Sequence, residues 1–154
     1  MVAIKFDTQM QSDVVADVFV SRVQGKASQK ESVSPRVWVG LLSNGVPGGV
    51  LRHVVQHIPK DVVTRTIGTD NTNLAKFYRR QRLTGKVTEE LNDLTKLWAE
   101  LREFFGWDEE LLKEWIEQKL PVLDGATPSE LMSSSAGRVI IRQQLDAMRY
   151  GDFA

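Results

Sequence analysis

The sequence predicts an all-α protein, and three observations support this fold class. Apolar residues recur three or four positions apart along most of the chain. Residues that favour helix N-caps precede these segments and glycines follow them, as at Ser34 and Gly45. The 154 residues are 42% hydrophobic and 26% charged, an ordinary composition for a globular chain. This length fits one compact domain or two small ones.

The N-terminal segment is the least clear element. Residues 12–24, "SDVVADVFVSRVQ", carry apolar residues at helical spacing, which predicts an amphipathic helix. Their β-branched valines leave a strand possible. Residues 25–34, "GKASQKESVS", offer almost nothing to bury and are typical of a linker. We therefore expect residues 1–33 to be an appendage and linker outside the core.

A helix is expected after Ser34, because Ser is a preferred N-cap and Pro35 suits the first helical position. The segment "RVWVGLLSN" continues this helix, and Gly45 ends it. The "VPGG" that follows predicts a turn, and "VLRHVVQHI" predicts the next helical segment.

Residues 59–83 predict a helix, a tight turn and a second helix. Pro59 starts a short helix that Gly68 ends, and its apolar face is Val62, Val63 and Ile67. Asp70 is the expected N-cap of a helix over residues 71–82. A glycine in the turn followed six positions later by an apolar residue is the spacing of a DNA-binding helix-turn-helix.

The second of these helices carries a polar, basic face opposite Leu74 and Phe77. The side chains predicted to contact DNA are Thr72, Asn73, Lys76, Arg79, Arg80 and Arg82. Arg and Lys suit guanine edges or phosphates, and Asn suits adenine. Arg65 and Lys86 could follow the phosphate backbone. The alternative is an ordinary helical hairpin with a solvated basic face.

A long amphipathic helix is expected from an N-cap at Thr88 to Gly106. Its apolar stripe comprises Leu91, Leu94, Leu97, Trp98, Leu101, Phe104 and Phe105. We expect this helix to bridge the two halves of the chain, with part of it in a homodimer contact.

Two further helices are predicted downstream. "DEELLKEWIEQKL" should bury Leu111, Leu112, Trp115 and Ile116, and its glutamates at 109, 110, 114 and 117 should form a solvated face rather than a catalytic pair. Asp124-Gly125 marks a turn, and Thr127 to Glu130 is a capping box with Pro128 at the first helical position. The last helix should point Val139, Ile140, Leu145 and Met148 inward and end at Gly151.

The net charge of zero conceals two electrostatically different halves. Residues 1–86 contain 13 Lys and Arg against 6 Asp and Glu, whereas residues 87–154 contain 7 against 14. A basic half and an acidic half predict two partners, one polyanionic and one a basic protein surface.

The composition argues against most enzyme classes. The chain has no cysteine, and His53 and His57 are the only histidines. These two stand four apart, as zinc ligands can, but no third ligand is evident. We expect no catalytic residues, no metal and no cofactor. With no basic leader before an apolar run and no stretch long enough to span a bilayer, a cytoplasmic protein is expected.

Motifs in the C-terminal half resemble those of one family, the toxin-binding domain of MbcA/ParS/Xre-type antitoxins. They are Phe105-Gly106, Trp115, Leu123, Gly125, Pro128, Leu131, Gly137 and Gly151. The preceding Gly45, Pro47, Gly68, Leu74 and Arg79-Arg80 are similar to the Xre-like DNA-binding half. The resemblance covers about residues 37–154. The sequence departs from the family at "KLPVLDG", where the family more often has an Asn beside the Pro. It also departs at "TDNTN", which lacks the commoner Ser-Pro/Arg start of the recognition helix.

The resemblance implies an antitoxin that neutralises an NAD-consuming RES-domain toxin and represses its own operon. It implies a homodimer within a hetero-oligomeric complex, bound to operator DNA through the helix-turn-helix. The family's C-terminal residues reach into the toxin's active-site cleft. The toxin-binding residues implied here are Arg138, Arg149, Tyr150, Asp152, Phe153 and Ala154. Alternatively, Phe153 folds back to cover the core edge.

The expected organisation is an appendage over residues 1–33, a DNA-binding domain over 34–86, and a bridging helix with the toxin-binding domain over 87–154. A second function stays open, in which the chain is a stand-alone transcriptional regulator whose C-terminal half only dimerises.

Overall fold

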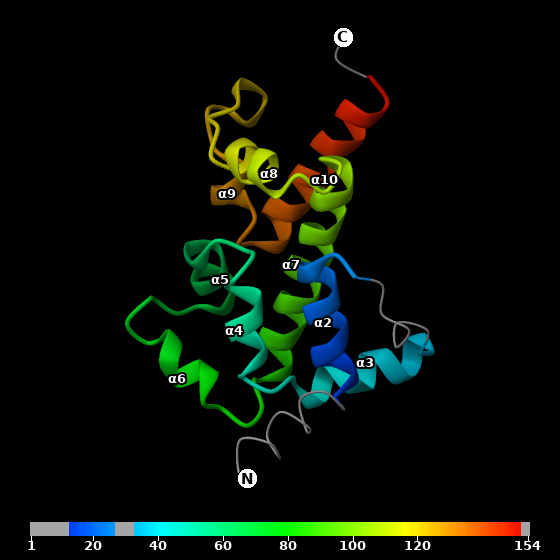
Figure 1. The fold of residues 1–154 in the computed structure, drawn as a ribbon, viewed down its shortest axis with the longest axis vertical. Coiled ribbons are helices and arrows are strands. Elements are labelled where there is room, and N and C mark those ends of the chain that lie inside the picture. Colours follow the sequence, from blue (N-terminus) through cyan, green and yellow to red (C-terminus); the bar gives the residue numbers. More distant parts are fainter. Residues whose placement is uncertain (1–12, 27–32, 152–154) are drawn as a thin grey trace.

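The computed structural model describes residues 13–26 and 33–151. Within these ranges every regular element is helical, which confirms the all-α prediction (Figure 1). The elements in chain order are α2 (Val14–Gln24), α3 (Pro35–Asn44), α4 (Val50–Val54), α5 (Lys60–Ile67), α6 (Leu74–Tyr78), α7 (Gly85–Phe104), α8 (Glu109–Ile116), the 3-10 turn η2 (Pro121–Leu123), α9 (Pro128–Leu131) and α10 (Ser135–Arg149). None of the described helices is both long and apolar enough to cross a membrane.

Helix α7 is the centre of the molecule. Along its length it packs against α2, α3 and α5 and against α8 and α10 (Figure 1). The side chains of Leu91, Leu94, Leu97, Trp98 and Leu101 are completely buried. Helix α7 thus contacts helices from both halves of the chain. Because these five residues are covered by the chain's own helices, this part of the stripe is not free for a homodimer contact.

The N-terminal segment is a helix of the core, so the prediction of an appendage is wrong for α2. Val15, Val18, Phe19 and Val23 are at most 2% exposed and join the cluster around α7. Arg22 strengthens the contact by donating from Nη1 to Oδ1 of Asn92 on α7, over 2.8 Å. The valines fit a helix here because one apolar stripe meets α7 and α4, and this packing outweighs their β preference. Residues 1–12 and 27–32, with most of the predicted linker, lie outside the described residues.

The predicted start and stop of α3 are confirmed. The hydroxyl of Ser34 accepts from the N–H of Val37, Pro35 occupies the first turn, and Gly45 follows the last residue with a φ of 84°. In the loop after α3, a Cβ on Gly48 would lie only 2.0 Å from the carbonyl oxygen of Phe77. The close approach of two backbones therefore requires glycine there.

Helix α5 has the predicted start, stop and apolar face, with Gly68 in the left-handed conformation at its end. The second helix, however, covers only Leu74–Tyr78 and not residues 71–82. On its N-terminal side, a carboxylate oxygen of Asp70 accepts from the N–H of Asn73, which holds residues 70–73 in a turn. On its C-terminal side, Gly48 N–H donates to the carbonyl of Arg80, so the backbone joins the loop after α3 rather than continuing the helix.

Helix α7 begins one turn earlier than predicted. Its N-cap is Thr84, whose side chain accepts from Val87 N–H, and Thr88 lies buried inside the first turn. The Thr88 hydroxyl accepts from the N–H of Val46 at 3.1 Å and donates to the carbonyl of Thr84 at 2.9 Å. The threonine that the sequence suggested as a cap instead fixes the loop between α3 and α4.

The C-terminal helices differ from the prediction in which side chains they bury. In α8, Leu112 and Ile116 are buried as expected, but Leu111 is 46% exposed. The Thr127 and Glu130 capping box before α9 is present as predicted.

Helix α10 is turned relative to the prediction. Val139 and Ile140 point outward, 52% and 42% exposed, while Arg138 and Ile141 are completely buried and Leu145 is only 3% exposed. A Cβ on Gly137 would lie 1.8 Å from the carbonyl oxygen of Leu131, so this glycine lets α10 start directly against α9.

Candidate functional site

Three acidic residues of α7, Glu90, Asp93 and Glu100, join this helix to α10 through a network of ion pairs. The Arg138 guanidinium donates from Nε to Oδ2 of Asp93 and from Nη2 to Oε2 of Glu90, both over 2.6 Å. Its Nη1 donates to the carbonyl of Met132 over 3.0 Å. Each nitrogen of this buried guanidinium thus has a partner, which is the condition for burying a charge in a stable fold.

Arg142, one turn further along α10, extends the network. It donates from Nε to Oε2 of Glu100 over 2.8 Å and pairs through Nη1 with Oδ1 of Asp93 over 2.9 Å. Burial alone would raise the pKa of Asp93, but hydrogen bonds and positive charge from Arg138 and Arg142 outweigh it and lower that pKa. The Asp93 carboxylate therefore stays ionised between the two guanidinium groups.

The network changes the role of Arg138. Its side chain is 1% exposed, so a partner protein cannot reach it in this conformation. The assignment of Arg138 to the toxin-binding surface is therefore wrong, and we assign it to the attachment of α10 to α7. Local sequence patterns could not indicate this role, because the carboxylate partners of Arg138 lie 45 and 48 positions earlier in the chain.

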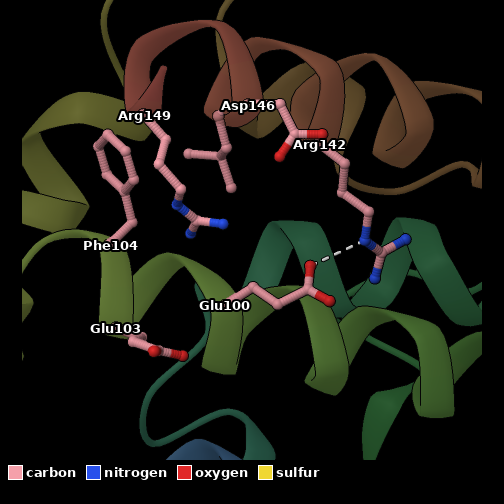
Figure 2. A pocket seen from close by; sticks show the side chains of 7 residues that line it. Glu100, Glu103, Phe104, Arg142, Asp146 and Arg149 are labelled. Atoms are coloured by element: carbon pink, nitrogen blue, oxygen red, sulfur yellow. Dashed lines mark hydrogen bonds and ion pairs between the residues drawn. The ribbon is translucent and has the colours of Figure 1, made fainter. Parts of the chain in front are cut away.

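A hollow opens beside the network, between α7 and α10 (Figure 2). It has a volume of about 560 Å³ and is lined by Glu100, Glu103, Phe104, Arg142, Leu145, Asp146 and Arg149. Arg149 extends toward the ring of Phe104, with its guanidinium carbon 5.9 Å from the ring centroid. Arg149 is exposed, and Tyr150, at the end of the helix, is 77% exposed. The hollow thus lies beside the last turn of α10.

Tyr150 and Arg149 keep the accessibility that the predicted toxin contact requires. Asp152, Phe153 and Ala154 lie outside the described residues, so the insertion of the tail into a toxin stays a prediction.

The six residues predicted to contact DNA have different surroundings. Thr72, Lys76 and Arg79 are exposed around α6, whose Leu74 faces the core. Arg80 stacks on the Phe77 ring, 4.1 Å from its centroid. Their role in DNA binding stays a prediction.

Asn73 and Arg82 are already engaged within the chain. The Asn73 side chain donates to Asp70, and Arg82 Nη1 pairs with Oδ2 of Asp13 at 2.5 Å and donates to the carbonyl of Gly45. Binding a base through Asn73 would require giving up its local hydrogen bonds. Arg82 helps to hold the start of α2, which the sequence could not indicate because the two residues are 69 positions apart.

Arg52 is a basic residue of this region that the sequence analysis missed. Its guanidinium lies 4.9 Å from the centroid of the Tyr78 ring, which brings α4 to the side of α6. Burial raises the pKa of Tyr78, and the charge of Arg52 offsets part of this rise.

His57 contacts an acidic residue rather than a second histidine. Its Nδ1 lies 3.2 Å from Oε1 of Glu109 at the start of α8. Among the residues that the structure describes, no three His, Asp or Glu side chains gather as a metal site would require.

Comparison with known proteins identifies the C-terminal part of the chain. Residues 100–151 match the family model described as the antitoxin Xre/MbcA/ParS C-terminal toxin-binding domain. This match supports an antitoxin of the MbcA/ParS/Xre type. The chain also matches the Prs ADP-ribosylating antitoxin of Sphingobium sp. (strain YBL2), with 27% identity over 135 residues, covering 79% of this chain and 83% of the relative. The resemblance to MbcA/ParS/Xre-type antitoxins is thereby confirmed.

The motifs that predicted the toxin-binding domain are mainly structural. Gly106 and Gly125 have positive φ angles of 64° and 82° at turns, and Gly137 permits the close contact with α9. Trp115 packs against Phe105, with ring centroids 5.4 Å apart. Such residues fix the shape of the domain.

Proposed function

We propose that this protein is the antitoxin of a toxin-antitoxin pair, that it inhibits an NAD-consuming RES-domain toxin, and that it represses its own operon. The main support for this proposal is the match of residues 100–151 to the antitoxin toxin-binding domain. The name of the Sphingobium relative contains "ADP-ribosylating", and ADP-ribosyl transfer consumes NAD, which supports an NAD-consuming partner. In this proposal the chain is a cytoplasmic regulator and not an enzyme, and it needs no cofactor.

Inhibition would come from the end of α10. Helix α10 ends at Arg149, and Tyr150 and Gly151 lead into Asp152, Phe153 and Ala154. An aromatic side chain such as that of Phe153 is a common anchor in protein interfaces, and the carboxylate of Asp152 suits a pocket built for an anionic nucleotide. The tail would thus exclude NAD by occupying its site.

Repression would come from the basic half of the chain. Helices α5 and α6 and the turn between them resemble a helix-turn-helix, with Lys76 and Arg79 exposed on the side opposite Leu74. In this proposal α6 and the chain after it lie against operator DNA, and a homodimer within the toxin complex would bring two such surfaces together.

Deletion of residues 151–154 tests the inhibition. The full chain and the truncated chain are each co-expressed with the toxin, and cellular NAD, co-purification and melting temperature are measured. We expect co-purification and normal NAD with the full chain. With the truncated chain we expect unchanged melting, because the tail lies beyond the last helix, together with loss of NAD.

The alternative arrangement predicts the opposite pattern. If Phe153 covers the edge of the core, the truncated protein melts at a lower temperature and still inhibits. If the full chain neither co-purifies with the toxin nor preserves NAD, the chain acts as a stand-alone regulator instead.

A further inference from the structure

Helix α10 presents an uncharged surface to solvent. At about 100° per residue, six residues fall on the side opposite the buried Arg138, Ile141 and Leu145. We call this side the α10 outer face, and it consists of Ala136, Val139, Ile140, Gln143, Ala147 and Tyr150. No charged residue of α10, all of which the structure describes, lies on this face, and the exposed Asp146 borders it.

The composition of this face is unusual for its surroundings. Residues 87–154 carry 14 acidic against 7 basic residues, yet the α10 outer face carries no charge along the length of the helix. Among the described residues, eight large hydrophobic side chains are exposed, and six of them lie within residues 100–151. Val139, Ile140 and Tyr150 of the outer face are three of these six. Exposed apolar side chains that gather on one element mark an interaction surface.

We propose that the α10 outer face is the docking surface for the toxin, and that this contact is apolar rather than a pairing of opposite charges. The inference rests on the proposed function and names the surface that performs it. The partner surface would be an uncharged groove that receives one face of a helix, with anchors at positions i, i+3, i+4, i+7 and beyond.

The position of the face on the chain selects the toxin as its occupant. The whole of α10 lies within the residues that match the toxin-binding domain. Tyr150 belongs to the face and is also the residue that leads into the tail. A toxin that encloses the tail in its cleft would therefore meet this face next, without any gap along the chain.

The orientation of α10 makes the face available. Arg138 and Arg142 bind carboxylates of α7, so these two arginines are held on the inner side and inner edge of the helix. Gly137 brings the start of the helix against α9. With the helix fixed in this rotation, Val139 and Ile140 cannot turn inward.

Val139 provides a test with a matched control elsewhere on the molecule. Val39 on α3 is 57% exposed, against 52% for Val139, and it lies outside the toxin-binding domain. The full-length variants Val139→Glu, Val139→Lys, Val39→Glu and Val39→Lys are titrated with purified RES-domain toxin. Melting temperature and molecular mass of each free antitoxin are measured as well, and Tyr150→Ala serves as a second, milder variant.

An apolar contact gives a specific pattern. Glu and Lys at position 139 should both weaken binding, by about thirtyfold or more if Val139 is a central anchor. Both variants at position 39 should bind like the wild type, and Tyr150→Ala should weaken binding. Wild-type affinity should change less than about threefold between low and high salt, because screening acts on charges and not on apolar burial.

Other patterns overturn the inference. If Glu at 139 strengthens binding while Lys weakens it, or if wild-type affinity falls tenfold or more with salt, the contact is electrostatic. Unchanged toxin binding by both Val139 variants would show that the α10 outer face does not contact the toxin. If these variants bind toxin normally but change the molecular mass of the free antitoxin, the face contacts a second copy of this chain. If the wild type does not bind the toxin, the proposed function itself fails.

Discussion

Helices α6 and α10 are both proposed to contact a partner, and they are held in opposite ways. Helix α10 has 15 residues and is fixed by ionic bonds on its inner side, which leaves an uncharged outer face. Helix α6 has five residues and is fixed by Leu74 and by backbone contacts to the loop after α3, which leaves Lys76 and Arg79 outside. The comparison teaches that an arginine on a helix does not by itself mark a binding surface, because the fold decides whether its side chain is buried in an ion pair or exposed to a partner.

The largest expected effect comes from breaking the attachment of α10. Replacing Arg138 with Met removes a buried cation, leaves Glu90 and the carbonyl of Met132 without this partner, and leaves Asp93 with Arg142 alone. We expect a loss of about 3 kcal/mol of unfolding free energy, measured by urea denaturation, because breaking a buried ion pair leaves an uncompensated charge. Arg149→Met, an exposed change on the same helix, should alter stability by less than about 0.5 kcal/mol. Equal effects of the two variants would contradict the structural role of Arg138.

A glycine substitution tests the attachment of α6. Gly48→Ala places a Cβ 2.0 Å from the carbonyl oxygen of Phe77, so the two backbones must separate. We expect a loss of about 1–3 kcal/mol, the usual cost of overpacking. Gly40→Ala in α3 is the control, since a Cβ there meets nothing within 4 Å. It should stabilise the protein by about 0.5–1 kcal/mol, because Ala is the better helix former. Thermal melts measure both variants, and equal destabilisation by Gly48→Ala and Gly40→Ala would contradict the close backbone contact at Gly48.

Salt dependence sharpens the contrast between the two surfaces. If α6 contacts DNA phosphates, Lys76→Ala and Arg79→Ala should each weaken operator binding and lower the salt slope by about one. Folding should be unaffected, because both side chains are exposed. Lys113→Ala, an exposed change on α8, is the matched control. Gel-shift titrations at several salt concentrations measure the slopes, and unchanged slopes would remove these residues from the interface.

The smallest effect concerns pH and the attachment of α10 to α7. Because the folded protein lowers the pKa of Asp93 below its ordinary value of 3.8, the ionised carboxylate stabilises the fold above that value. This stabilisation is lost as pH falls through the lowered pKa. Asp93→Asn should therefore reduce the melting temperature at neutral pH, and the difference from wild type should shrink below about pH 4. A difference that stays constant down to strongly acidic pH would show that Asp93 does not act through its charge.

The candidate surfaces were only partly predictable from the sequence. Lys76 and Arg79 are exposed, as expected from their position opposite Leu74, since one buried leucine in a short helix orients the rest. Arg138 was assigned to the wrong side, because apolar residues occur on more than one side of α10 and Val139 and Ile140 were expected to fill the core. The surface of the toxin-binding domain could therefore not be derived from periodicity alone.

The sequence by itself determined the all-α class, most of the caps and turns, and the membership of the C-terminal motifs in an antitoxin domain. Ser34 before α3, Gly68 after α5 and the Thr127–Glu130 box depend on contacts within four residues, so local chemistry suffices to place them. Tertiary structure decided that α2 belongs to the core, that Thr88 binds the loop between α3 and α4, and that Arg138 of α10 is buried against α7. Each of these depends on partners more than 40 residues away, since Asn92 holds Arg22, Val46 binds Thr88, and Glu90 and Asp93 bind Arg138.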